Sequence, residues 1–283
     1  MAFSTSTNIH QAQDGRAHAY SVVDSIAALH AAGFTHADVT LTAWCAPDGP
    51  MARPDWQAWV GEIGEVLARH GMAANQTHTL FYLHKADAET LAFQEEMVAR
   101  CLQATGMLGA PWTVMHILRV VDLGTRDPDE AMDRNEAYFR PYGELARRHG
   151  VGIAIENGLT GLYHHAADLL ELVRRLNDDA FGICWDTGHA NIVCPDQGPE
   201  IRSLGRHLKA LHLNDNHGVK DEHLLPFFGT VDFAAVMAAV RDTGFSGVLT
   251  LESAGSVRSL PACMRPEALR LAAATGEALR RLG

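Results

Sequence analysis

The feature that most restricts the fold is a regular alternation of short apolar segments with longer amphipathic ones along the 283 residues. Short apolar runs bounded by turn residues are typical of strands, whereas apolar residues repeated every three to four positions indicate helices. The expected strands are 3–8, 37–44, 73–80, 112–118, 152–157, a run from Phe181 into Asp186, 208–213 and 247–253. The expected helices are 21–32, 54–70, 88–108, 129–149, 165–176, 200–207, 233–243 and 265–282.

Strands that are separated by helices must pair in parallel, and eight such units can close into a barrel of about 250 residues. No long linker and no change of composition interrupts the chain. We therefore predict one domain, residues 1–283, folded as a single (β/α)8 TIM barrel of the α/β class. An open, doubly wound sheet is the competing layout, but no G-x-G-x-x-G follows the first strand to support it.

Composition narrows the class of protein. The chain is 47% hydrophobic and 20% charged, as ordinary soluble proteins are, and its net charge of −11 without a Lys/Arg run argues against nucleic acid as a partner. Five widely spaced cysteines indicate reduced thiols of a cytoplasmic protein. No signal peptide and no apolar run of about 20 residues is recognised, so we expect no membrane association. The oligomeric state stays open, a homo-oligomer included.

Carboxylates and imidazoles gather where the expected strands end. In a barrel these ends converge on one face, and carboxylate oxygen and imidazole nitrogen are ligands of divalent metal ions. Glu is almost never fully buried unless it is paired, whereas a single His near a strand end is more often structural. The candidate ligands are His78, His116, Glu156, Asp186, His189, His212, Asp221, His223 and Glu252. Their joint pattern predicts a metal site.

Five motifs resemble those of the xylose isomerase-like TIM barrel superfamily. They are IENG from Ile155, WDTGHA from Trp185, HLNDN from His212, D-x-H from Asp221 and LES from Leu251. The resemblance covers essentially the whole chain and implies the barrel fold. This superfamily includes sugar and sugar-phosphate isomerases and epimerases, and apurinic endonucleases of the endonuclease IV type.

Similarity to the ketose 3-epimerases implies one Mn²⁺, Mg²⁺ or Co²⁺ ion bound by Glu156, Asp186, His212 and Glu252. Such an ion polarises a substrate carbonyl and stabilises the enediolate that forms when a neighbouring C–H loses its proton. Glu156 and Glu252 would then remove and return the proton, and His189 would contact the substrate. These three are the candidate catalytic residues.

Similarity to the endonucleases implies three zinc ions instead. The additional ligands would be His78, His116, His189, Asp221 and His223. Because residues of the required type are present at all nine positions, a zinc site and a site with more than one metal ion both stay open. The acidic charge and the WDTGH motif favour the sugar enzymes, and the loop LLPFFGTVDF lacks the G-x-G that usually follows D-x-H in both branches.

Other residues could contact the substrate. An Arg six residues after His212 binds substrate in ketose 3-epimerases, and Gly218 stands there. Phe227 and Phe228 either wall a small-molecule pocket or pack beneath their loop. Candidates for stacking on a sugar ring are Trp44, Tyr82, Trp112 and Trp185, although single aromatic residues on strands more often belong to the core.

We therefore interpret the chain as a divalent-metal-dependent isomerase or epimerase of a small sugar, sugar phosphate, or related polyol or keto acid. The expected partner is a small polyhydroxy substrate. The alternative is a zinc-cluster apurinic endonuclease or phosphodiesterase, and dehydratases and hydrolases on the same scaffold stay open.

Overall fold

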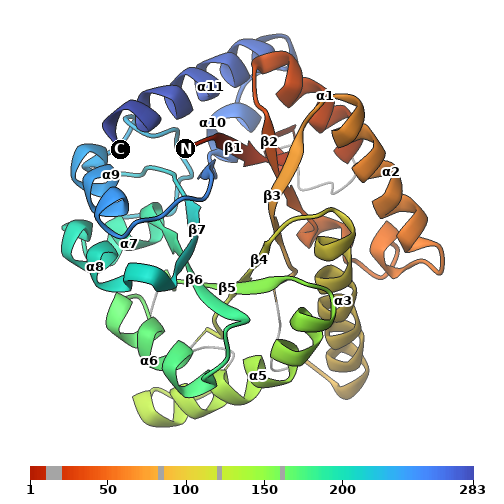
Figure 1. Cartoon of the computed structure of the whole chain (residues 1–283), viewed down its shortest axis with the longest axis vertical. Helices are drawn as coiled ribbons and strands as arrows, with labels where there is room; N and C mark the ends of the chain where they lie inside the picture. Colours follow the sequence, from red (N-terminus) through yellow and green to blue (C-terminus); the bar gives the residue numbers. More distant parts are fainter. Residues whose placement is uncertain (11–20, 82–85, 120–122, 160–162) are drawn as a thin grey trace.

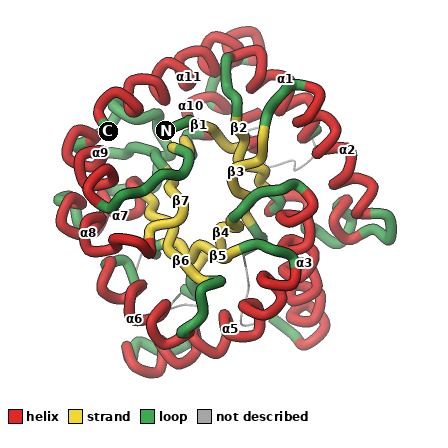
Figure 2. Tube along the Cα trace, in the orientation of Figure 1, coloured by secondary structure: helices red, strands yellow, loops and turns green. Residues whose placement is uncertain are grey.

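Eight parallel strands form the centre of the computed structural model, which describes residues 1–10, 21–81, 86–119, 123–159 and 163–283 (Figure 1). They are β1 (Phe3–Ser6), β2 (His36–Thr40), β3 (Ala73–His78), β4 (Trp112–His116), β5 (Gly152–Glu156), β6 (Phe181–Asp186), β7 (Leu208–His212) and β8 (Leu249–Leu251). Their order in the sheet is β7-β6-β5-β4-β3-β2-β1-β8. Figure 2 shows the strands as an inner ring with the helices outside it.

The ring closes between β7 and β8, just beyond the ends of these two strands. The Leu213 N–H donates to the Thr250 carbonyl over 2.8 Å, and the Glu252 N–H donates to the Leu213 carbonyl over 3.1 Å. Leu213 and Leu251 are joined by one parallel bridge. The predicted barrel is confirmed as a nearly closed one, and the open sheet is wrong. That residues 1–283 form one domain stays a prediction.

Helices follow the strands around the outside of the barrel. They are α1 (Val22–Ala32), α2 (Trp56–Arg69), α3 (Ala88–Met107), α5 (Pro128–Arg148), α6 (Ala166–Leu176), α7 (Thr187–Val193), α8 (Gln197–Leu204), α9 (Phe233–Asp242), α10 (Ala254–Arg258) and α11 (Arg265–Leu282). Seven of the eight expected helices agree within two residues at either end. The eighth, 200–207, begins three residues earlier, at Gln197, and its last three residues are a 3-10 turn, Gly205–His207.

Local side-chain chemistry sets several helix ends. The Asp87 side chain accepts from the Thr90 N–H at the start of α3, and Asp127 accepts from the N–H groups of Asp129 and Glu130 at the start of α5. Gly33 ends α1 at φ +103°, a left-handed conformation that glycine adopts without strain.

Two short helices, α7 and α10, were not predicted, and several strands are shorter than expected. Residues 37–44 do not form one strand, because β2 ends at Thr40 and Thr42–Trp44 is a 3-10 turn. Likewise 247–253 contains only the three-residue strand β8. After β2 the Leu41 N–H still donates to the His78 carbonyl of β3, and after β8 the Glu252 N–H donates to the Leu213 carbonyl, before the backbone turns away into loops.

The barrel interior combines small apolar side chains with polar ones. Residues two apart on a strand lie on the same face, and the buried cluster inside the ring consists of Val114, Ala154, Cys184 and Ala210. Beside it lie four polar side chains that are no more than 2% exposed: Ser4, Asp38, Gln76 and Thr250. A barrel of this type is usually filled by branched apolar residues, so this interior is unusually polar.

The helices of the described ranges include none that is both long and apolar enough to cross a membrane. All five cysteines are unpaired, as expected. The cytoplasmic location stays a prediction.

Asp215 anchors the loop between β7 and α9. This buried carboxylate accepts from the N–H groups of Asn216 (2.9 Å), Val231 (3.1 Å) and Gly229 (2.8 Å). An added Cβ at Gly229 would lie 2.3 Å from the Asn216 carbonyl oxygen, so the close approach requires glycine. Because both ends of the loop are tied to Asp215, the segment that carries Asp221 has a defined position.

We predict that Asp215→Ala lowers the free energy of unfolding by about 3 kcal/mol, because three backbone N–H groups lose a charged acceptor. Asp232→Ala is the matched control, since Asp232 caps α9 through the Ala235 N–H alone and its loss should cost about 1 kcal/mol. Chemical denaturation of both variants measures the difference. Equal losses would contradict the anchoring role of Asp215.

Candidate metal centre

The candidate ligands occupy the carboxyl ends of neighbouring strands. Glu156, Asp186 and His212 are the last residues of β5, β6 and β7. The parallel register sets Asp186 beside His212 and His116 beside Glu156. Glu252 follows β8 directly and is brought to His212 by the closure of the ring. These side chains share the inner face because each lies an even number of residues from the small interior residues of its strand.

Four of these residues converge on one point. Glu156, Asp186, His212 and Glu252 each offer a ligand atom, and these atoms all lie within 4.8 Å of one another. His212 Nδ1 lies 2.7 Å from Glu156 Oε1, 3.1 Å from Glu252 Oε2 and 3.9 Å from Asp186 Oδ2. Three carboxylates therefore surround one imidazole nitrogen in a buried position.

This donor set fits a divalent metal ion. Within the described part of the chain, the buried Glu156 Oε2 has no hydrogen-bond partner. Burying three carboxylates beside one imidazole is costly unless further positive charge compensates them. Carboxylate oxygen with imidazole nitrogen is a set that Mn²⁺, Co²⁺ and Zn²⁺ accept.

The remaining five candidates extend the cluster on both sides. His116 Nε2 and His78 Nε2 lie 3.2 and 3.5 Å from Glu156 Oε2. On the other side, Asp221 Oδ2 lies 2.9 Å from His223 Nε2 and 3.5 Å from His189 Nε2. All nine residues named from the sequence thus lie in one contiguous cluster.

Backbone carbonyls orient three of the histidines in the same way. The Nδ1–H of His78 donates to the Thr79 carbonyl over 2.8 Å, that of His189 to the Asn157 carbonyl over 2.9 Å, and that of His223 to the Glu252 carbonyl over 3.0 Å. A carbonyl can only accept, so Nδ1 carries the proton and Nε2 keeps its lone pair in the neutral ring. Each Nε2 faces a carboxylate of the cluster, which is the orientation that metal-binding histidines require.

The unpredicted helix α7 positions Asp186 and His189. Asp186 Oδ1 accepts from the His189 N–H over 2.7 Å, and Asp186 Oδ2 accepts from Asn214 Nδ2 over 2.7 Å. The Asn157 side chain bonds to both the N–H and the carbonyl of Asp186, over 2.6 and 3.0 Å. The helix begins at Asp186 because its carboxylate caps it, and one turn then brings His189 over the site.

Burial and the crowding of charges shift the pKa values of the cluster. Burial raises the pKa of Asp186 to about 7, and the nearby Glu156 and Glu252 add to the effect. Burial alone would raise the pKa of Glu252 as well, but the His212 ring lowers it to about 2. Burial lowers the pKa of His116 to about 3. In the absence of a metal ion, the carboxyl groups of the cluster therefore have very different pKa values, about 7 for Asp186 and about 2 for Glu252.

Asp38 and Phe81 also lie at this cluster, and neither was predicted from the sequence. Asp38, on β2, is 1% exposed; its Oδ2 lies 3.9 Å from His212 Nε2, and burial raises its pKa to about 6. The signal that could have identified Asp38 is that an acidic residue stands within an expected strand. Phe81 is 57% exposed and stacks on the His116 ring at a centroid distance of 4.5 Å, and no sequence pattern marks it.

The aromatic candidates have different positions. Trp44 and Trp185 are buried in the core, and Trp185 Nε1 donates to Gln197 Oε1 over 3.1 Å. Trp112 begins β4 and so lies at the other end of the barrel. Tyr82 lies outside the described residues.

The loop that follows His212 contains Gly218, Phe227 and Phe228. Phe227 packs edge-on against Phe233, with ring centroids 5.3 Å apart, while half of its surface and 56% of that of Phe228 stay exposed. Gly218 has φ +75°, a conformation that a side chain such as Arg would strain.

Comparison with known proteins gives one family match and several partial similarities. A family model described as xylose isomerase-like TIM barrel matches residues 26–281. An uncharacterized protein of Sinorhizobium fredii is 30% identical over 165 residues, which is 56% of this chain and 52% of that protein. The chain thus spans about half the length of this curated relative.

Two further similarities cover more of the chain. The L-ribulose-5-phosphate 3-epimerase UlaE of Salmonella paratyphi C is 25% identical over 228 residues, 76% of this chain and 77% of that protein. A crystal structure of a D-psicose 3-epimerase in the presence of D-fructose has a TM-score of 0.78 at 16% identity, over 99% of both chains. The latter similarity establishes a shared fold.

We predict that the pair His223–Asp221 makes the stability of the metal-free protein depend on pH. Burial opposes the charged ring, but the bond to Asp221 raises the pKa of His223 to about 10, above its ordinary 6.5. The stability from this pair is therefore complete below pH 6.5 and is lost as the pH rises through 10. At most, this loss has a slope of about 1.4 kcal/mol per pH unit.

The measurement is chemical denaturation of chelator-treated protein over about four pH units, from about pH 6 to about pH 10. The free energy of unfolding of the wild type should exceed that of His223→Gln at low pH, and the difference should shrink as the pH rises. Asp221→Asn should have the same free energy of unfolding as His223→Gln. Parallel stability curves for the three proteins would show that the pair does not form.

Proposed function

The chain belongs to the xylose isomerase-like TIM barrel family, and from that premise we propose that it is a divalent-metal-dependent epimerase or isomerase of a small ketose or ketose phosphate. The observation that carries the proposal is the convergence of Glu156, Asp186, His212 and Glu252 within 4.8 Å. These four residues would hold one Mn²⁺, Mg²⁺ or Co²⁺ ion. When bound, the ion supplies polarisation of a substrate carbonyl and stabilisation of the negative charge that develops on it.

Glu156 and Glu252 are suited to move the proton. Their carboxylates approach His212 Nδ1 from β5 and from the end of β8, at 2.7 and 3.1 Å. A substrate carbon held between two such carboxylates can lose a proton to one and receive a proton from the other. Return to the opposite face inverts that carbon, which is epimerisation. Return to the adjacent carbon converts an aldose into a ketose or the reverse.

His189 is suited to bind a substrate hydroxyl. Its Nδ1–H is held by the Asn157 carbonyl over 2.9 Å, so the ring has a defined direction, and its Nε2 faces Asp221. The exposed Phe81 ring, stacked on His116, offers an apolar surface at the edge of the same cluster. A sugar presents both hydroxyl groups and C–H faces, and these two residues match them.

The substrate class rests on the 25% identity to an L-ribulose-5-phosphate 3-epimerase. Gly218 stands where the ketose 3-epimerases carry a substrate-binding Arg, so other residues must supply that contact here. A ketose or its phosphate is therefore the class to test first, with keto acids and polyols next.

We predict that Glu156→Gln and Glu252→Gln each lower kcat by about a thousandfold, because the amide cannot accept the proton. The assay is a panel of ketoses and ketose 5-phosphates in deuterium oxide, with solvent deuterium expected at the carbon that is inverted or isomerised. Glu144→Gln, 66% exposed on α5, is the matched control and should keep wild-type activity.

Metal content must be measured for each variant, so that loss of the ion is distinguished from loss of the base. An active Glu252→Gln variant with full metal content would contradict the proton-transfer role. Turnover of the panel without deuterium incorporation would contradict the proposed enediolate chemistry.

A zinc-cluster phosphodiesterase of the apurinic endonuclease type is the second candidate. The observation that favours it is the clustering of all nine candidate ligands. Three of the histidines are held through Nδ1 so that Nε2 faces a carboxylate. The net charge of −11 favours a small substrate over a nucleic-acid backbone.

Metal stoichiometry by elemental mass spectrometry separates the two candidates. We expect about one Mn, Mg or Co per chain, retained in the His116→Gln variant, because His116 would not be a ligand of a single ion bound by Glu156, Asp186, His212 and Glu252. Two or three zinc ions per chain, one of them lost in His116→Gln, would favour the phosphodiesterase. Nicking of a duplex with one abasic site would then establish it.

A further inference from the structure

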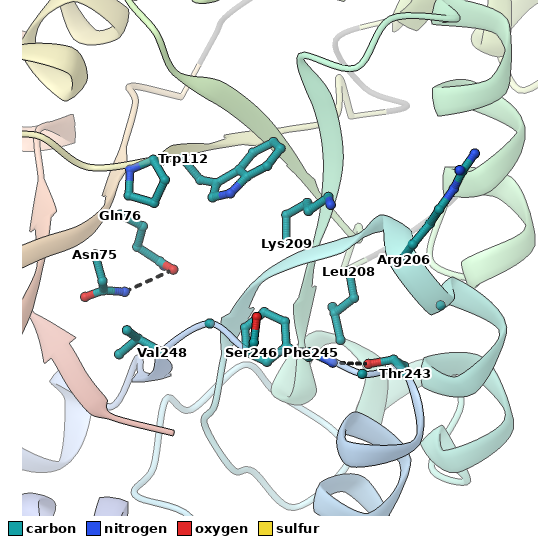
Figure 3. Close-up of a pocket in the computed structure, with 14 residues that line it drawn as sticks. Asn75, Gln76, Trp112, Arg206, Leu208, Lys209, Thr243, Phe245, Ser246 and Val248 are labelled. Carbon is teal, nitrogen blue, oxygen red and sulfur yellow. Dashed lines mark hydrogen bonds between the residues drawn. The ribbon is translucent and has the colours of Figure 1, made fainter.

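A cavity of about 420 Å³ opens at the amino-terminal end of the barrel (Figure 3). It is bordered by the first residues of β4 and β7, by Asn75 and Gln76 of β3, and by the loop 243–248 before β8. The candidate metal ligands lie at the opposite ends of the same strands. Trp112 and His116, four residues apart on β4, are separated by about 13 Å. The cavity is therefore distinct from the metal centre.

Two glycines shape this cavity. An added Cβ at Gly152 would lie 2.1 Å from the Trp112 ring, and one at Gly182 would lie 2.2 Å from Lys209 Cγ. The absence of side chains on β5 and β6 thus makes room for an indole and for a lysine stem. Lys209 Nζ lies 5.6 Å from the centroid of the Trp112 ring, close enough for a cation–π interaction.

Lys209 points inward because β7 carries an extra residue. Ile183 of β6 pairs with Leu208, but the next residue, Cys184, pairs with Ala210, so Lys209 is unmatched. A bulge of this kind redirects a side chain. Figure 3 shows Lys209 beside Trp112, with Asn75 and Gln76 across the cavity.

Gln76 borders the cavity with a buried side-chain amide. Its side chain is 2% exposed, and in the part of the chain that the structure describes its Nε2 forms no hydrogen bond. Its Oε1 is engaged, because Thr250 Oγ1 donates to it over 3.2 Å. The Gln76 side chain also lowers the pKa of the buried Asp38 carboxyl, so its amide lies close to Asp38 as well as at the border of the cavity.

The charge of the lining is positive. Among the described residues, the charged side chains that border the cavity are Lys209 and Arg206, and none that borders it is acidic, although the chain as a whole carries −11. Arg206 is exposed at the rim and its side chain extends away from Trp112 in Figure 3. Lys209 is therefore the cation that faces the interior. A partly enclosed site of one charge sign attracts small ions of the opposite sign.

We propose that this cavity binds a small organic anion, a carboxylate or phosphate of a few carbon atoms. Its charged group lies at Lys209, and its carbon atoms contact Trp112 and Phe245. The volume lies within the range of small-molecule sites. Gln76 precedes His78 by two residues, and its partner Thr250 precedes Glu252 by two, so the border of the cavity is linked to two strands that lead to the metal centre. The proposal is independent of the proposed function.

Isothermal titration calorimetry of the whole chain, residues 1–283, tests it with three matched probes, glycerol 3-phosphate, glycerate and uncharged glycerol. At least one anion should bind with equal affinity to chelator-treated and Mn²⁺-loaded protein, and glycerol should not bind. Which anion binds more tightly distinguishes a phosphate site from a carboxylate site.

Substitutions of Lys209 test whether the anion binds in this cavity. Lys209→Met keeps the stem beside Trp112 and should weaken anion binding at least about tenfold, since a hydrogen bond to a charged group is lost. Lys209→Arg should retain binding within a few-fold. Arg281→Met, 74% exposed on α11, removes the same charge elsewhere and should bind as wild type does.

Three results would overturn the proposal. They are no binding of either anion at millimolar concentration, binding that disappears with the metal ion, and binding that Lys209→Met leaves unchanged. If circular dichroism shows that Lys209→Met does not fold, a crystal structure of wild type with the tighter anion decides. Density between Lys209 and Gln76 supports the site, and density only elsewhere refutes it.

Discussion

Closure of the barrel between β7 and β8 is the constraint on which the rest of the structure depends. It rests on a few contacts beyond the regular strands, chiefly the two hydrogen bonds of Leu213 to Thr250 and Glu252. These bonds bring Glu252, near the end of the chain, to 3.1 Å from His212 Nδ1. Without closure the cluster would lack one of its three central carboxylates, and the interior polar groups would be open to solvent.

The closed ring contains groups that a stable core would exclude. Glu156, Asp186 and His212 are each at most 1% exposed, and Asp38 lies beneath them. Burial of like charges destabilises a protein unless a cation compensates them, so this arrangement is understandable as a binding site rather than as packing. At the opposite end of the barrel, Gly152 of β5 and Gly182 of β6 leave space for Trp112 and Lys209.

Position and orientation of the ligands have different origins. Position follows from the parallel register, which aligns the last residues of neighbouring strands. Orientation follows from backbone carbonyls outside the strands, which accept the Nδ1 protons of His78, His189 and His223. Because these carbonyls belong to the turns after the strands, the loops carry out the fine adjustment of a site that the barrel places.

The sequence by itself determined the alternation of strands and helices and the barrel, and it predicted nine candidate ligands at the strand ends and in the segments that follow them. These depend on local periodicity and on the rule that parallel strands end on one face. It did not reveal α7, since that helix begins only where the Asp186 carboxylate caps it and Asn157 holds its backbone. The role of Asp38, the stacking of Phe81 on His116 and the inward turn of Lys209 were likewise decided by the tertiary structure. Each depends on contacts between strands distant in the chain, or on a single extra residue in their register, and neither leaves a periodic signal in the sequence.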